Sequence, residues 1–123
     1  MIADEIPTRV PSIDECNFTS NASYIHLTSN ETISGAQWKI FPENTAPLVA
    51  DMSSDFLSKP LDISNFGLIY AGAQKNLGPA GVTLVIIKDE LADKCPEHIP
   101  TIFRYKTYIE NNSLFNTVPT FPV

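Results

Sequence analysis

Lys75 is the residue of this chain whose surroundings best suit cofactor chemistry. It follows an apolar run, residues 66–71, and lies in a loop of small and polar residues that reaches Asn76. A lysine amine at such a place has a rigid anchor, little steric bulk around it and a dry wall behind it, which favours covalent binding of a cofactor. Taken alone the pattern is weak, because a lysine is more often a solvated surface charge.

A carboxylate occupies a similar position at the end of a second apolar run. Asp51 follows residues 47–50, and an aspartate there is often only a cap or a turn residue. Ser53 and Ser54 could likewise cap a turn as readily as touch a ligand. The ends of strands in an open α/β sheet gather on the side where ligands bind. Lys75 and Asp51 together therefore favour a binding site more than either residue does alone.

Four short apolar runs must position these side chains. The expected strands are residues 23–28, 47–50, 66–71 and 82–87. Their apolar residues are nearly continuous rather than alternating, which is typical of strands covered on both faces. Residues 78–81 are expected to form the turn before the last strand. The sequence thus predicts an α/β fold built on a sheet.

Helices that could cover this sheet are scarce. Residues 89–94 make one or two turns, residues 60–65 are too short for a crossover helix, and residues 115–120 have the pattern of an approach to a helix. A sheet with so little cover would expose large apolar faces to water. We therefore expect an incomplete domain, with residues 1–22 as a linker or arm and residues 23–123 as part of a larger unit.

Composition and charge limit the classes of partner. The 123 residues are 43% hydrophobic and 18% charged, as in a folded globular protein. With 14 acidic against 8 basic residues the formal charge is -6, and no basic stripe is present to follow a nucleic-acid backbone. No apolar run reaches the length of about 20 residues that spans a bilayer, and the first residues lack the pattern of a signal peptide. We expect a cytoplasmic protein with no nucleic-acid or membrane partner.

The residues that often bind metals form no cluster in the sequence. Cys16 and Cys95 lie far apart and outside any zinc-type spacing, so free thiols are expected. His26 and His98 have no neighbouring carboxylate or cysteine pattern, and structural roles are favoured for both. No metal site is predicted.

Several blocks of sequence, in a fixed order, resemble the phosphoserine aminotransferase family of pyridoxal-phosphate enzymes. The blocks are residues 29–35, 50–54, 66–81 and 112–120. The run Gly-Ala-Gln-Lys-Asn, with Gly-Pro-Ala-Gly just beyond it, is far more specific than a lone glycine-rich loop. The resemblance begins near residue 23 and covers only the middle of a typical member. It implies part of the cofactor-binding large domain of a fold-type I transferase, with a mostly parallel sheet and helices.

The resemblance also implies a role for each matched polar residue. Lys75 would bind the aldehyde of pyridoxal 5′-phosphate as a Schiff base and would later move a proton. Asp51 would pair with the pyridine nitrogen and keep it protonated, which strengthens the ring's capacity to withdraw electrons. The other implied cofactor ligands are Thr32 at the phenolic oxygen, Gln74 at the phosphate, and Asn116 and Thr117 at the phosphate of the neighbouring subunit's cofactor.

The activity implied by the resemblance is transamination. Glutamate and 3-phosphohydroxypyruvate would give 2-oxoglutarate and phosphoserine in serine biosynthesis, some members also act in pyridoxine biosynthesis, and the full-length family is homodimeric. The family's substrate-binding arginines have no counterpart here, because Arg9 and Arg104 fall outside the matched blocks. The alternative is an inactive truncated remnant, or a protein that only binds a partner.

Overall fold

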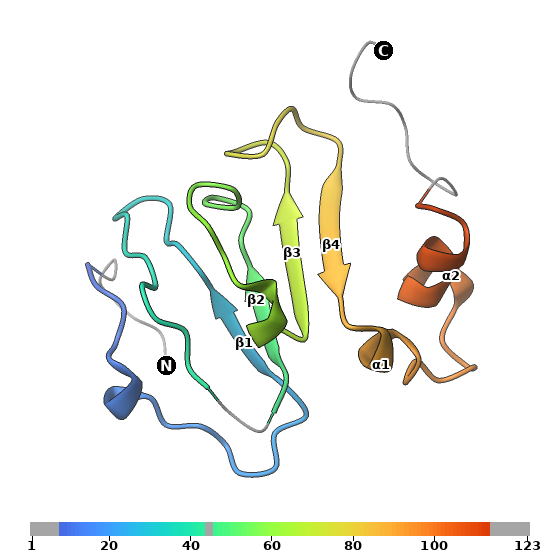
Figure 1. The fold of residues 1–123 in the computed structure, drawn as a ribbon, viewed down its shortest axis with the longest axis horizontal. Coiled ribbons are helices and arrows are strands. Elements are labelled where there is room, and N and C mark those ends of the chain that lie inside the picture. The colour runs from blue at the N-terminus through green and yellow to red at the C-terminus, as the bar shows by residue number, and fades with distance from the viewer. Residues whose placement is uncertain (1–7, 44–45, 114–123) are drawn as a thin grey trace.

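Four short strands form one sheet at the centre of the molecule (Figure 1). They are β1 (Ile25–Thr28), β2 (Leu48–Asp51), β3 (Leu68–Gly72) and β4 (Thr83–Ile87). The strands lie in chain order, with β1 and β2 parallel, β2 and β3 parallel, and β3 and β4 antiparallel. The computed structural model describes residues 8–43 and 46–113.

Each strand falls on one of the apolar runs in the sequence, which confirms the α/β class and the mostly parallel sheet. Asp51, expected just beyond its strand, is instead the last residue of β2, because its backbone pairs with Thr28 on one side and Tyr70 on the other. The direction of β4 does not follow from the apolar pattern. It is antiparallel because a short loop, and no helix, joins Gly72 to Thr83.

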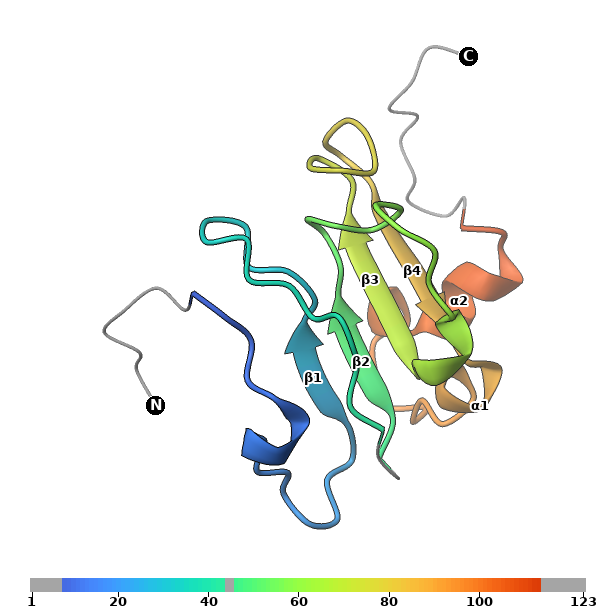
Figure 2. The ribbon, with the colours of Figure 1, turned by 60° about the vertical axis from the view of Figure 1, so that its left-hand side comes forward.

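Helical segments are few and short in the described part of the chain. They are the helices α1 (Asp89–Ala92) and α2 (Tyr105–Glu110) and the 3-10 turns η1 (Ile13–Glu15), η2 (Ile63–Asn65) and η3 (Thr101–Phe103). Figures 1 and 2 place α1 and α2 beside β4 and away from β1. None of these helices is long and apolar enough to cross a membrane. The helical turns expected at residues 89–94 correspond to α1, and residues 60–65 contain only the 3-10 turn η2, in agreement with the expectation that they are too short for a crossover helix. The helix α2 was not predicted.

The core lies on one face of the sheet. Its buried members are Leu27, Leu48, Ala50, Met52, Phe56, Phe66, Ile69 and Ala71. Burial of a large apolar side chain contributes about 1.5–3 kcal/mol, so this cluster holds the three parallel strands together. Loop residues cover it, and the rings of Phe41 and Phe66 pack edge to face with centroids 4.9 Å apart.

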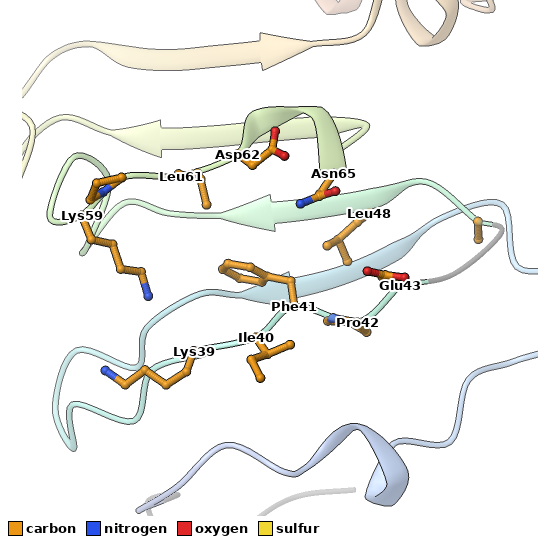
Figure 3. Close-up of a pocket in the computed structure, with 12 residues that line it drawn as sticks. Lys39, Ile40, Phe41, Pro42, Glu43, Leu48, Lys59, Leu61, Asp62 and Asn65 are labelled. Atoms are coloured by element: carbon orange, nitrogen blue, oxygen red, sulfur yellow. The ribbon is translucent and has the colours of Figure 1, made fainter.

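Two loops on this face leave a cavity of about 490 Å³ between them, drawn in Figure 3. Phe41, Leu48 and Leu61 give it an apolar floor, and Lys39 and Lys59 stand at its rim. None of the residues implicated by the sequence lines it. The cavity is therefore separate from the expected cofactor site.

The opposite face of the sheet is partly polar over β1, β2 and β3. His26, Asp51 and Tyr70 alternate with core residues along their strands and are not buried. Large apolar side chains elsewhere also remain exposed, among them Ile33 at 78% and Phe103 at 72%. This exposure agrees with an incomplete domain. The division at residues 22 and 23 stays a prediction.

The two cysteines are free thiols, as expected. Within the first stretch of the chain the described residues form only η1, next to an exposed ion pair of 2.8 Å between Arg9 and Glu15.

Candidate active site

The candidate site lies where the three parallel strands end. β1, β2 and β3 finish at Thr28, Asp51 and Gly72, and the loops that follow them lie along the same edge of the sheet, in the upper part of Figure 1. In a parallel sheet this edge is where ligands bind, because successive loops deliver their side chains to one place. Each residue that the sequence implicates in the described part of the chain comes from one of these strand ends or loops.

Lys75 and Thr32 meet at this edge although 43 residues separate them. The Lys75 ammonium Nζ donates a hydrogen bond to Thr32 Oγ1 at 2.6 Å, and both side chains are exposed. A solvated lysine with no partner, the usual case, is therefore not what the structure contains. The contact brings together the end of a lysine side chain and a hydroxyl group in an accessible position.

The loop that carries Thr32 is held by its own hydrogen bonds. An isolated bridge between Asn30 and Gln37 closes it. The Glu31 carboxylate accepts hydrogen bonds from the backbone N–H groups of Ser34, at 2.6 Å, and Ile33, at 3.1 Å. These bonds, led by that of Ser34, lower the pKa of Glu31 below its ordinary value, and the charge of Lys75 adds a little. Glu31 therefore carries its negative charge beside the amine.

Asp51 is held in place by the residue two positions after it. Its Oδ1 accepts hydrogen bonds from the Ser53 backbone N–H at 2.9 Å and from Ser53 Oγ at 2.6 Å. Ser53 Oγ in turn accepts a hydrogen bond of 2.9 Å from the Gly72 backbone N–H. The carboxylate at the end of β2 is thus connected to the end of β3, where the loop of Lys75 begins.

A tyrosine and a histidine extend this polar group on the open face of the sheet. Tyr70 pairs with Asp51 in the β2–β3 register, and its hydroxyl group lies 3.0 Å from His26 Nε2. The two rings are stacked with centroids 6.0 Å apart. Burial, followed by the charge of Asp51, raises the pKa of Tyr70, so the phenol stays neutral beside the carboxylate. The structural role expected for His26 agrees with this contact.

Gln74 lies close to the same strand end. A methyl group placed on Gly72 would come within 2.8 Å of Gln74 Oε1, so the amide of Gln74 folds back over Gly72. On the other side of Lys75, Asn76 Nδ2 donates a hydrogen bond of 2.7 Å to the backbone carbonyl of Phe56. The lysine loop is therefore attached to the loop after β2 on both sides of Lys75.

Two residues implied by the resemblance, Asn116 and Thr117, lie outside the described residues. Of the others, Thr32 and Lys75 contact each other directly. Asp51 and Gln74 are brought near each other through Gly72 rather than by direct contact.

A partly buried polar cluster close to the site was missed by the sequence analysis. Ser29, only 1% exposed, donates a hydrogen bond through Oγ to Asp55 Oδ1, and Gln37 Nε2 donates to Asp55 Oδ2 at 2.9 Å. These bonds join the loop after β1 to the loop after β2. Only Ser29 directly follows a strand, whereas Gln37 and Asp55 lie further along the two loops, so local sequence gives no signal for their pairing.

Comparison with known proteins identifies the class. Residues 8–121 match the model of the class-V aminotransferase family, "Aminotransferase class-V". The chain belongs to this family.

Similar individual proteins are phosphoserine aminotransferases. That of Niallia circulans is 56% identical over 115 residues, which are 93% of this chain and 32% of the relative. That of Herpetosiphon aurantiacus is 57% identical over 116 residues, 94% of this chain and 32% of the relative. The chain thus spans about a third of the length of the curated relatives it matches.

Solved structures of phosphoserine aminotransferases have the same fold. The structure from Bacillus circulans subsp. alkalophilus superposes with a TM-score of 0.84 at 57% identity, covering 91% of this chain and 31% of that one. A PLP-bound structure from Trichomonas vaginalis gives a TM-score of 0.82 at 39% identity, covering 94% of this chain and 34% of that one. The expected resemblance and fold are confirmed, and the chain is a partial α/β domain of this type.

Proposed function

We propose that this chain carries part of the cofactor site of a pyridoxal-phosphate-dependent phosphoserine aminotransferase, with Lys75 as the residue that binds the cofactor covalently. The observation that carries the proposal is the hydrogen bond of 2.6 Å between Lys75 Nζ and Thr32 Oγ1 at the carboxyl edge of the sheet. Membership of the class-V aminotransferase family supports it, as do the relatives named phosphoserine aminotransferase.

The described residues fit the chemistry of pyridoxal phosphate. Its aldehyde and its phenolic oxygen are on adjacent ring carbons, so the two residues that hold them must be neighbours, as Lys75 and Thr32 are. Its ring nitrogen is basic and needs an anion, which Asp51 can supply at the end of the adjacent strand. The amide of Gln74, in the same loop as Lys75, is a suitable donor for a phosphate oxygen.

When bound, the cofactor supplies an aldehyde that exchanges amino groups and a ring that accepts electrons from the substrate carbon. Asp51 would keep a proton on the ring nitrogen. Lys75 would anchor the aldehyde carbon until the amino donor displaces it, and its freed amine would then carry a proton to and from the substrate carbon. Thr32 would hold the phenolic oxygen, and Gln74 the phosphate. Asn116 and Thr117 would reach the phosphate in a neighbouring subunit.

The relatives are named for phosphoserine, and the family resemblance implies the other reactants. We infer glutamate as amino donor and 3-phosphohydroxypyruvate as acceptor, in serine biosynthesis, within a cytoplasmic homodimer. A role in pyridoxine biosynthesis is a further expectation of the family resemblance. Because the chain spans about a third of its relatives, the residues that bind the substrate are expected in the remaining two thirds.

Borohydride trapping tests the central assignment. The chain is incubated with pyridoxal phosphate, reduced with borohydride, digested and mapped. We expect the label on Lys75 when the cofactor is limiting, and its loss in Lys75→Arg. Lys94→Arg is the matched control, because Lys94 is an exposed lysine far from the strand ends. Equal labelling of several lysines, or undiminished labelling in Lys75→Arg, would contradict the assignment.

The 123-residue chain alone should not turn over substrate. Neither Arg9 nor Arg104 lies at the candidate site, since Arg9 pairs with Glu15 and Arg104 donates to the backbone carbonyls of Glu97 and Ile99. Without arginines to hold two anionic substrates, glutamate-dependent consumption of 3-phosphohydroxypyruvate should stay at background. Steady turnover by the purified chain would refute this prediction while leaving the assignment of Lys75 open to the trapping experiment.

A further inference from the structure

We propose that the turn after β2, residues 52–57, is a brace that fixes Asp51 and the Lys75 loop relative to each other, with Ser53 as its central positioning residue. The proposal rests on the proposed function, since it concerns the same site. It assigns no contact with cofactor or substrate to Ser53. Instead, Ser53 acts through the two residues that it joins.

The hydroxyl group of Ser53 has two partners on different strands. It donates to Asp51 Oδ1 at 2.6 Å and accepts from the Gly72 backbone N–H at 2.9 Å. The Ser53 backbone N–H adds a second donor to the same carboxylate oxygen at 2.9 Å. One carboxylate oxygen is therefore held by two donors, which restricts rotation of the Asp51 side chain.

A second hydrogen bond attaches the same turn to the far side of Lys75. Asn76 Nδ2 donates to the Phe56 carbonyl at 2.7 Å. Lys75 is therefore bracketed, with Gly72 three residues before it and Asn76 one residue after it, both bonded to the turn. Hydrogen bonds to the turn thus hold the loop on both sides of the amine.

The turn is itself anchored in the core. Met52 and Phe56 are 3% and 8% exposed and belong to the buried cluster. The Met52 N–H bonds to the Tyr70 carbonyl at 2.8 Å, and the Phe56 N–H bonds to the Met52 carbonyl at 2.9 Å. Because packed side chains hold both ends of the turn, Ser53 has a fixed position from which to orient Asp51 and Gly72.

The brace explains why a serine lies two residues after the carboxylate. A capping serine, the alternative left open by the sequence, would bond only within its own turn. Ser53 instead reaches Gly72, 19 residues away on another strand. Ser54 behaves differently, because its Oγ joins Asn30 through both the side-chain amide and the backbone carbonyl, and makes no bond to Asp51.

Hydrogen exchange of the uncomplexed chain, followed by NMR, tests the brace without any cofactor. Ser53→Ala removes the acceptor of the Gly72 N–H, so we expect the Gly72 amide to exchange about tenfold faster, the equivalent of about 1.4 kcal/mol. If the loop is braced, the Gly78 amide, bonded to the Ala73 carbonyl at 2.7 Å on the other side of Lys75, should also exchange faster. Ser53→Thr keeps a hydroxyl group and should restore both rates.

Ser58→Ala is the matched control. Ser58 is an exposed serine just after the turn of residues 52–57, and its side chain has no hydrogen bond to Asp51 or Gly72. Urea unfolding of all variants should show that Ser53→Ala remains folded. Unchanged exchange at Gly72, or faster exchange at Gly72 alone with Gly78 unaffected, would overturn the brace. So would faster exchange that Ser53→Thr fails to reverse.

Trapping with pyridoxal phosphate then distinguishes the positioning role of Ser53 from the cofactor-binding role of Lys75. We expect Ser53→Ala to lower labelling of Lys75 about tenfold at limiting cofactor, and Ser53→Thr to recover it. Altered exchange with undiminished labelling of Lys75 would overturn the positioning role. No labelling of Lys75 in the unmodified chain would refute the proposed function, while the exchange rates of Gly72 and Gly78 would still decide whether the brace exists.

Discussion

The carboxyl ends of β1, β2 and β3 contrast with the groove beside β4. At the strand ends, three loops bond to one another through side chains such as Ser29, Ser53 and Lys75. The groove has a volume of about 610 Å³ and is lined by apolar residues that include Val85, Phe103 and Ile109. Its side chains are partly open to water, with Ile102 57% and Ile109 48% exposed.

The contrast shows which parts of a partial domain its own residues can hold in place. The hydrogen bonds described at the strand ends join loops that follow consecutive strands, so both partners of each bond belong to this chain. An apolar groove gains stability only when another surface covers it. The chain spans about a third of its relatives, and the exposed groove agrees with a domain that continues beyond it. The polar edge, formed by the loops at the carboxyl ends of β1, β2 and β3, should therefore be rigid in the isolated chain. The groove should bind other apolar surfaces.

The largest effect is expected where the polar edge is buried. Ser29 is buried, and its hydroxyl group donates a hydrogen bond to Asp55 Oδ1. Ser29→Ala removes that donor, and water has little access to replace it. We expect a loss of about 1–3 kcal/mol in the free energy of unfolding, measured by urea titration, because a partly buried carboxylate loses a hydrogen bond. Ser58→Ala, at an exposed serine, should change it by less than about 0.5 kcal/mol. Equal effects of the two substitutions would mean that the polar edge is not held by these bonds.

A second substitution should weaken binding more than folding. In Gly72→Ala the new methyl group meets the end of the Gln74 side chain at 2.8 Å, and a flexible amide can move aside at little cost. We expect less than about 1 kcal/mol of destabilisation. The displaced amide would leave the position proposed for the cofactor phosphate, so the apparent affinity for pyridoxal phosphate should fall about tenfold, or about 1.4 kcal/mol. An affinity equal to that of the unmodified chain would remove Gln74 from the proposed site.

Gly67→Ala is the comparison variant for that experiment. Its methyl group would meet the rigid ring of Pro47 at 2.8 Å as well as Leu91, at the opposite end of β3 from Gly72. It should therefore destabilise the fold by about 1–3 kcal/mol through overpacking. Its affinity for pyridoxal phosphate, measured where the chain is still folded, should be unchanged.

The elements of the fold could be predicted from sequence because they depend on local patterns. Continuous apolar runs identify the strands, and the glycines of residues 78–81 identify the turn before β4. The apolar pattern did not show the antiparallel direction of β4, which follows from the short connection between Gly72 and Thr83. The helix α2 was not predicted either. A short helix such as α2 has too few residues to show a period and gains its stability from tertiary contacts.

The site divides in the same way. Lys75 and Asp51 are recognisable at the ends of apolar runs, and family resemblance supplies a role for each. The bonds of Ser53 to Gly72 and of Ser29 to Asp55 depend on the register of neighbouring strands, which pairs Leu27 with Ala50 and Ala50 with Ile69. The hydrogen bond between Ser53 and Gly72 joins residues 19 positions apart, so the spacing of nearby residues in the sequence does not predict it.

At the groove, substitution should change surface properties and leave stability almost unchanged. Phe103 is 72% exposed, so Phe103→Ser should alter the free energy of unfolding by less than about 0.5 kcal/mol. The same change removes a large apolar side chain from the groove and should reduce binding of an apolar fluorescent dye and self-association in sedimentation experiments. Loss of stability comparable to that of Ser29→Ala would show that the groove is part of the core.

The smallest expected effect is a shift in titration at the polar edge. Backbone N–H groups of Ser34 and Ile33 lower the pKa of Glu31 in the folded chain, so folding favours its charged form. Its contribution to stability is therefore present above the unfolded pKa, about 4.3, and is lost as the pH falls through the lower folded value. Because Glu31 is open to solvent, this contribution is small, and NMR titration of its carboxyl carbon is the suitable measurement.

Ser34→Ala removes the side-chain hydrogen bond of Ser34 and should raise the pKa of Glu31 slightly. Lys75→Met should raise this pKa even less, because the charge of Lys75 is the weakest of the causes. A larger shift in Lys75→Met than in Ser34→Ala would mean that the amine, rather than the loop's own hydrogen bonds, holds the charge of Glu31 in place.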